Sequence, residues 1–180
     1  MRTIIVCAGH SDQQSGAASP DGKHKEEELA QWLRNRVATL LRADGMTVLT
    51  DGDPAVNQSL NHAISLLKQY QNALAVEFHF NAGPSQVRGV EVLSKSHLKR
   101  TAQNIAAAIA TITGSPLRGV LGWKADNSGQ HHRLAFCEAG GLVVEVEFIS
   151  NPNALNVYLA MRDQVAVSLE NALREAAREG

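Results

Sequence analysis

Three residues from distant parts of the chain carry the side chains of a metal site. His10 comes after the apolar run of residues 3–8, separated from it by Gly9. Glu26 lies at the start of a stretch whose apolar residues have helical spacing, and His79 lies near the end of the apolar run of residues 73–80. Two imidazoles and one carboxylate form the donor set of many catalytic zinc sites, which keep a coordination position open for water. Together the three predict hydrolytic chemistry at a Zn²⁺ ion, although each histidine alone is more typical of a hydrogen-bonded structural residue.

Two further carboxylates, Glu145 and Glu147, lie in the apolar segment 142–149. Residues two apart in a strand share one face of the sheet. Burial and mutual repulsion would raise the pKa of at least one of these groups, as a general acid or base working near neutral pH requires. An edge strand with a solvated face would explain the same pattern without catalysis, and the residues alone leave both interpretations open.

Alternating strand and helix patterns supply the elements that would position these residues. Short apolar runs predict strands at residues 3–8, 46–50, 73–80, 88–93 and 142–149. Apolar residues at helical spacing predict helices within residues 25–43, 55–71 and 98–112, and from Pro152 through Leu173. Gly45 ends the first helix and Asn151 with Pro152 starts the last. The glycine-rich segment 117–141 is predicted to be mostly surface loop.

This order predicts a single α/β domain over residues 1–180, a three-layer sandwich whose twisted, mixed, mainly parallel sheet is flanked by helices. Ligands of such sheets collect at the carboxyl ends of the strands. A zinc site is therefore expected at that edge, near Gly9 and His10, His79 to Asn81, and Glu145 to Asn151.

The direction of Glu26 follows from a helical wheel of residues 25–43. Glu26 lies within roughly 60° of the apolar stripe that includes Leu29 and Leu33, whereas Glu27 and Glu28 point sideways and outward. Glu26 is therefore predicted to face inward, where a carboxylate needs a partner. The alternative is a solvated Glu26 that favours the positive end of the helix dipole.

Composition argues against several other classes of function. The 17 Lys and Arg nearly balance the 18 Asp and Glu, for a formal charge of −1, whereas domains that bind nucleic acid usually carry a basic surplus. The chain lacks the ~20 apolar residues of a transmembrane helix and the apolar core of about 7 to 15 residues of a signal peptide. Cys7 and Cys137 have no metal or redox spacing and are predicted to be buried apolar residues. We expect a soluble monomer without nucleic-acid partners.

Motifs in the same order resemble those of the zinc-dependent N-acetylmuramoyl-L-alanine amidases of bacterial cell-wall hydrolases and phage endolysins. The matching segments are residues 4–10, 26–50, 77–81 and 145–151, so the resemblance covers nearly the whole chain. It implies that His10, Glu26 and His79 bind Zn²⁺ and that Glu145 is the catalytic acid and base. The implied reaction is hydrolysis of the amide bond between N-acetylmuramic acid and L-alanine in peptidoglycan.

The chain departs from the family pattern near these motifs. Ser11 and Asp12 follow Gly-His where many members have two glycines, Glu77 replaces a serine, and Glu147 replaces a glycine. The candidate substrate-binding residues are Asn81, Glu147, His131 and His132. His24, two residues before Glu26, points in a different direction on the helix and is a weaker candidate ligand.

The resemblance also bears on biological role. Without a separate wall-binding domain or signal peptide, the sequence favours a phage or prophage endolysin, made in the host cytoplasm and released to the periplasm and peptidoglycan by a holin-type partner. A domain trimmed from a larger secreted amidase would look the same. Three other functions remain open: a muramidase using Glu145 and Glu147 without metal, a zinc peptidase acting within the stem peptide, and a non-catalytic wall-binding protein.

Overall fold

The computed structural model describes residues 2–52, 55–128 and 134–179. The strands of this described part are β1 (Ile4–Ala8), β2 (Val48–Thr50), β3 (Leu74–Asn81), β4 (Glu91–Ser94), β5 (Trp123–Ala125) and β6 (Leu142–Phe148). The helices are α1 (Glu26–Ala43), α2 (Leu60–Gln69), α3 (Lys99–Thr113), α4 (Ala135–Glu138) and α5 (Pro152–Glu179), with a 3₁₀ turn η1 (Ser96–Leu98) before α3. None of these helices combines the length and apolarity needed to cross a membrane.

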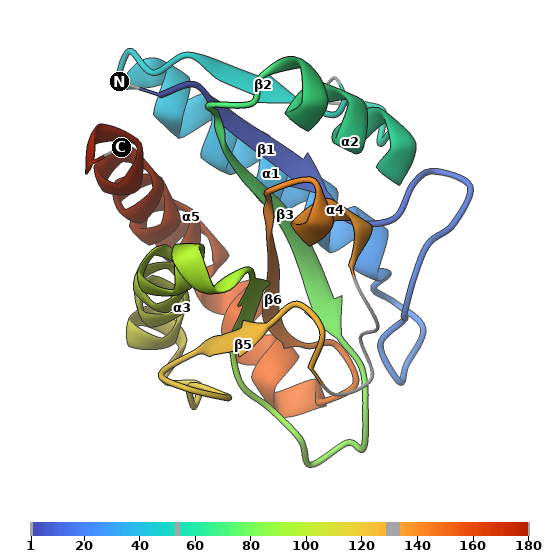
Figure 1. Ribbon diagram of the computed structural model, residues 1–180. Coiled ribbons are helices and arrows are strands. Elements are labelled where there is room, and N and C mark those ends of the chain that lie inside the picture. Colours follow the sequence, from blue (N-terminus) through green and yellow to red (C-terminus); the bar gives the residue numbers. More distant parts are fainter. Residues whose placement is uncertain (1, 53–54, 129–133, 180) are drawn as a thin grey trace.

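The strands form one twisted sheet with helices on both faces (Figure 1). Its order is β2-β1-β3-β6-β4-β5, with β2, β1, β3 and β6 parallel, β4 antiparallel to β6, and β5 parallel to β4. Side chains of α1, α3 and α5 pack against one face, and those of α2 and α4 against the other. The predicted α/β sandwich with a mixed, mainly parallel sheet is confirmed.

The buried strands are apolar on both faces because helices cover both sides. In β1, Ile4 and Val6 contact the α1 side, while Ile5 and Cys7 contact the α2 side. Cys7 and Cys137 are buried free thiols, as predicted. Strand β6 lies between β3 and β4, so the interpretation of residues 142–149 as an edge strand with a solvated face is wrong.

The segment predicted as loop, residues 117–141, also contains the short elements β5 and α4. Both elements depend on contacts with residues elsewhere in the fold, which the spacing of apolar residues within the segment does not reveal. Val92 of β4 pairs with Trp123 of β5, and Phe136 of α4 is buried against Gly141, where an added Cβ would overlap the phenyl ring.

A buried ion pair joins α1 to the carboxyl ends of β1 and β2. Nη1 of Arg34, a fully buried residue, lies 2.9 Å from Oδ1 of Asp51. Asp51 accepts a hydrogen bond from the Ala8 amide at 3.1 Å, and Asn57 accepts one from Arg34 and donates one to the Gly9 carbonyl, both at 3.1 Å. This network fixes the backbone just before His10.

Removing the buried cation is expected to destabilise the fold far more than removing an exposed one from the same helix. Arg34→Met leaves Asp51 buried without its cation and should lower the free energy of unfolding by about 3–5 kcal/mol. Arg36 is paired with Asp163 at 2.9 Å in an exposed contact, so Arg36→Met should cost about 0–1 kcal/mol. Urea unfolding of both variants measures the difference, and equal losses would contradict the role of the network.

Candidate active site

The carboxyl ends of β1 and β3 and the first residue of α1 bring the predicted ligands together. His10, Glu26 and His79 each offer a ligand atom within 4.8 Å of the others. Nε2 of His10 lies 2.9 Å from Oε2 of Glu26, and Nδ1 of His79 lies 3.1 Å from Oε1 of the same carboxylate. One carboxylate thus lies between two imidazoles.

Glu26 is the most heavily bonded of the three. Besides the two imidazoles, its oxygens accept hydrogen bonds from the amides of Ala17 and Phe80, both at 3.0 Å. Burial raises the pKa of this carboxyl, but the hydrogen bonds from His10 and His79 outweigh burial and hold the pKa well below its usual range. Glu26 is 5% exposed, so the alternative of a solvated side chain at the helix end is wrong.

Two glycines let these side chains approach. An added Cβ at Gly9 would overlap the imidazole of His79, and one at Gly16 would lie 2.5 Å from Nε2 of His10. His10 itself has a φ of 67°, in the left-handed region that residues with a side chain rarely adopt. His10 is therefore a strained backbone position of the site. The hydrogen bond from Asn57 to the carbonyl of Gly9, the preceding residue, helps to hold it.

Glu77 supports His79 from the same strand. Its Oε2 lies 3.0 Å from Nε2 of His79, and the side chain is buried. Burial lowers the pKa of His79, but the contacts with Glu26 and Glu77 raise it further than burial lowers it, to a net value well above normal. Since Nε2 is bound to Glu77, Nδ1 is the nitrogen that faces Glu26.

Glu145 faces the same cavity from the neighbouring strand, directly opposite His79 in the register of β3 and β6. Its Oε2 is buried without a hydrogen-bond partner in the described part of the chain. Burial raises the pKa of Glu145 to about 7; His79 opposes this rise, and the Glu26 and Glu91 carboxylates add to it. The cavity, of about 390 Å³, is lined by Glu145, the three candidate ligands and an apolar wall that includes Leu60 and Phe136.

These residues fit a zinc ion. An ionised carboxylate and two imidazole nitrogens are donors that Zn²⁺ prefers. The second nitrogen of His79 is held by a carboxylate, as is common for histidines that bind metals. Glu145, whose buried Oε2 has no partner among the described residues, lines the cavity together with these donors.

Glu147 does not join the site. A register shift opposes residues 79 and 81 of β3 with residues 145 and 148 of β6, so β6 carries an extra residue there. The expectation that Glu145 and Glu147 share a face is wrong for this reason. Glu147 is 1% exposed and accepts hydrogen bonds from Ser115 and from the amides of Gly89 and Phe148.

Of the remaining candidate residues, the structure places Asn81 at the cavity and leaves His24 outside the ligand cluster. Asn81 lines the cavity and donates a hydrogen bond to Glu91 at 3.1 Å. His24 is not among the residues whose ligand atoms converge with Glu26. His131 and His132 lie outside the described residues. Sequence reasoning missed the network of Arg34, Asp51 and Asn57, although an aspartate just after a predicted strand was a usable signal.

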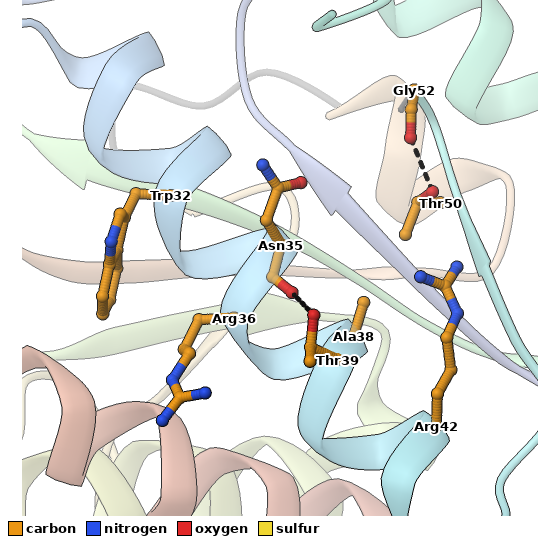
Figure 2. A pocket seen from close by; sticks show the side chains of 8 residues that line it. All are labelled: Trp32, Asn35, Arg36, Ala38, Thr39, Arg42, Thr50 and Gly52. Carbon is orange, nitrogen blue, oxygen red and sulfur yellow. Dashed lines mark hydrogen bonds between the residues drawn. The ribbon is translucent and has the colours of Figure 1, made fainter. Parts of the chain in front are cut away.

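A larger pocket, of about 580 Å³, lies along α1 away from this site. Figure 2 shows its lining, with Arg36 and Arg42 on α1 and Thr50 and Gly52 on the segment beside it. Arg36 is paired with Asp163, and Arg42 donates a hydrogen bond to the Val48 carbonyl at 3.2 Å. The lining contains none of the candidate ligands, so the smaller cavity is the better candidate for catalysis.

Comparison with known families agrees with this geometry. A family model described as N-acetylmuramoyl-L-alanine amidase matches residues 4–175. The chain belongs to this family. As a member of the N-acetylmuramoyl-L-alanine amidase family it is a hydrolase of the amidase type, and the resemblance seen in the sequence motifs is confirmed.

Solved structures share the fold of this amidase family member over nearly its whole length. A Neisseria meningitidis protein with a provisional assignment as N-acetylmuramoyl-L-alanine amidase is 38% identical, with 97% of this chain and 95% of that chain covered and a TM-score of 0.88. The catalytic domain of CwlV, an N-acetylmuramoyl-L-alanine amidase from Bacillus (Paenibacillus) polymyxa var. colistinus, is 20% identical, with 98% of each chain covered and a TM-score of 0.83. AmiC2 of Nostoc punctiforme is 18% identical, with 98% and 97% covered and a TM-score of 0.80. A comparison with curated proteins gave no match.

The support that Glu77 gives to His79 predicts a loss of zinc affinity in Glu77→Gln. A carboxylate that holds the second nitrogen of a ligating histidine typically improves metal affinity by about 10–100-fold. The affinity for Zn²⁺, measured by competition with a chelating dye, should fall by about that factor. The matched control is Glu28→Gln, at an exposed residue of α1, which should bind zinc as the unchanged protein does. Equal affinities in the two variants would reject this role of Glu77.

The raised pKa of Glu145 predicts a pH-dependent effect of Glu145→Gln on stability in the presence of EDTA. The folded pKa of about 7 exceeds the ordinary glutamate value of 4.5, so the unfolded chain loses this proton first. Ionisation of Glu145 therefore destabilises the fold progressively from about pH 4.5 to pH 7 and fully above that, by roughly 3 kcal/mol. Glu145→Gln should be more stable than the unchanged protein at pH 8 and not at pH 4. A stability difference that does not vary with pH in urea unfolding would contradict the assignment.

Proposed function

We propose that this chain is a zinc-dependent N-acetylmuramoyl-L-alanine amidase that hydrolyses the amide bond between N-acetylmuramic acid and L-alanine in peptidoglycan. The observation that carries the proposal is the convergence of His10, Glu26 and His79 in a cavity that Glu145 also lines, with Oε2 of Glu145 unpartnered in the described part of the chain. Membership in the amidase family supports the choice of bond.

The ion would be held by His10, Glu26 and His79. When bound, zinc supplies Lewis acidity, which polarises a carbonyl group and lowers the pKa of a water molecule. Glu26 would offset part of the ion's charge, because its pKa lies well below its usual range and the carboxylate is therefore ionised. Glu77 and the network before His10 keep the two imidazoles oriented.

Glu145 moves the protons. Its carboxylate takes a proton from the attacking water as the water oxygen bonds to the lactyl carbonyl carbon of N-acetylmuramic acid. Glu145 then returns the proton to the L-alanine nitrogen as the carbon–nitrogen bond breaks, which leaves a carboxylate on the sugar and a free amino terminus on the peptide. A pKa of about 7 suits both roles, since each protonation state is accessible near neutral pH.

Of the other functions that the sequence left open, the structure argues against a muramidase and a non-catalytic protein but does not distinguish a zinc peptidase. A muramidase would need Glu147 beside Glu145, but the carboxylate of Glu147 is bonded to the amides of Gly89 and Phe148. A non-catalytic protein would have no need of Glu145, a buried carboxyl group, in the cavity beside the candidate ligands. A zinc peptidase acting within the stem peptide would share the metal chemistry, and the products separate it from an amidase.

The biological setting stays a prediction. The endolysin role predicts that the protein lyses sacculi from outer-membrane-permeabilised cells and depends on a membrane-disrupting partner in the host. The monomeric state is likewise a prediction from the sequence, which sedimentation equilibrium measures directly.

Glu145→Gln is expected to retain one equivalent of zinc and to lose at least about 10²–10⁴ of the rate on purified peptidoglycan. Digestion by the unchanged protein should release amino-terminal L-alanine without new reducing sugars, and a chelator should abolish turnover until zinc is restored. Glu28→Gln serves as the exposed control. Full hydrolysis by Glu145→Gln or by the chelated protein would refute the mechanism, and mass spectra showing cleavage inside the stem peptide would refute the choice of bond.

A further inference from the structure

A second cavity, of about 290 Å³, adjoins the catalytic one. Asn81 and Ala82 at the end of β3 line both cavities. The charged residues of the second cavity are Glu91 of β4, Lys124 of β5 and Arg118 from the segment before β5. A group bound there would therefore lie directly beside a substrate in the catalytic cavity.

The charged side chains of this second cavity carry a net positive charge. Oε2 of Glu91 lies 2.7 Å from both Nε of Arg118 and Nζ of Lys124, while Oε1 accepts the hydrogen bond from Asn81. Glu91 is 2% exposed, whereas the Arg118 and Lys124 side chains are 33% and 29% exposed. Two cations thus share one buried carboxylate oxygen, so that one positive charge is not neutralised within the cluster.

The guanidinium of Arg118 is held with its outer edge available. Its Nε is bound to Glu91, and its carbon lies 4.9 Å from the ring centroid of Phe148, which also lines the cavity. The two terminal nitrogens have no hydrogen-bond partner among residues 2–52, 55–128 and 134–179. A guanidinium fixed in this way can bind a carboxylate through two parallel hydrogen bonds.

We propose that this cavity is a subsite for a carboxylate of the stem peptide, bound by Arg118 and Lys124 and organised by Glu91. The inference rests on the proposed function and deepens it. In a muramoyl peptide the sugar is neutral and the scissile amide carries no charge, so the anionic groups are the carboxylates beyond L-alanine. The cationic cavity therefore takes the peptide side of the substrate, and Glu91 acts as a positioning residue.

The test uses two synthetic muramoyl peptides that differ only in the residue after L-alanine, which carries either a free α-carboxylate or a carboxamide. The zinc-loaded protein should cleave the carboxylate form with a kcat/KM about 10–100-fold higher, as expected for charge-assisted hydrogen bonds. Arg118→Gln and Lys124→Gln should each lose most of this preference, with the loss falling on the carboxylate substrate. Arg36→Gln, the same change in the remote pocket, should keep the preference.

Two outcomes would overturn the subsite. The first is that the zinc-loaded protein cleaves both peptides equally well. The second is that Arg118→Gln and Lys124→Gln slow cleavage of both peptides by the same factor, which is the result expected if the cations only neutralise Glu91.

Calorimetric binding of both peptides to zinc-loaded Glu145→Gln separates the subsite from the proposed function. Tighter binding of the carboxylate form supports the subsite even if the unchanged protein cleaves neither peptide, an outcome that would reject the proposed function alone. Equal binding of the two forms overturns the subsite whatever the cleavage result.

Discussion

The carboxylate of Glu26 is the interaction on which the site depends. It sits at the start of α1 and binds His10 after β1, His79 and the Phe80 amide in β3, and the Ala17 amide in the loop between β1 and α1. Burying a charge is unfavourable unless hydrogen bonds compensate for lost hydration, and here each oxygen receives an amide and faces an imidazole. The donor atoms are therefore close together before a ligand binds, so little binding free energy is lost in ordering them.

The two carboxylates that line the catalytic cavity have opposite electrostatic surroundings. Glu26 has four polar partners, and its pKa lies well below the usual range. Glu145 has a buried oxygen that no other described residue contacts through a hydrogen bond, and burial raises the pKa of Glu145 to about 7. When the surroundings of two carboxyl groups move their pKa values apart in this way, the two groups take different roles in catalysis. The fold thus distinguishes a permanent anion, suited to hold a cation, from a carboxyl group suited to exchange protons.

Much of this arrangement could be predicted because it follows from local periodicity and parallel topology. The helical wheel selected Glu26 over its neighbours, and the rule that ligands collect at carboxyl ends of strands grouped His10, His79 and Glu145. The rule that residues i and i+2 share a face failed at Glu147, because the extra residue in β6 breaks the alternation and depends on pairing with β3. Arg34 was missed because a helical arginine is normally solvated, and its burial depends on Asp51 and Asn57, which are remote in sequence.

The direction of β4 determines what else lies beside the catalytic groups. Because β4 runs antiparallel to β6, its first residue, Glu91, pairs with Glu145, the middle residue of β6, which lines the catalytic cavity. In a parallel strand the first residue would lie at the opposite edge of the sheet, away from the carboxyl ends of β1, β3 and β6. Strand β5 is parallel to β4 and continues this reversal, so Lys124 reaches the same carboxylate. One reversed strand thus places a buried anion and its cations next to a site that the parallel strands form.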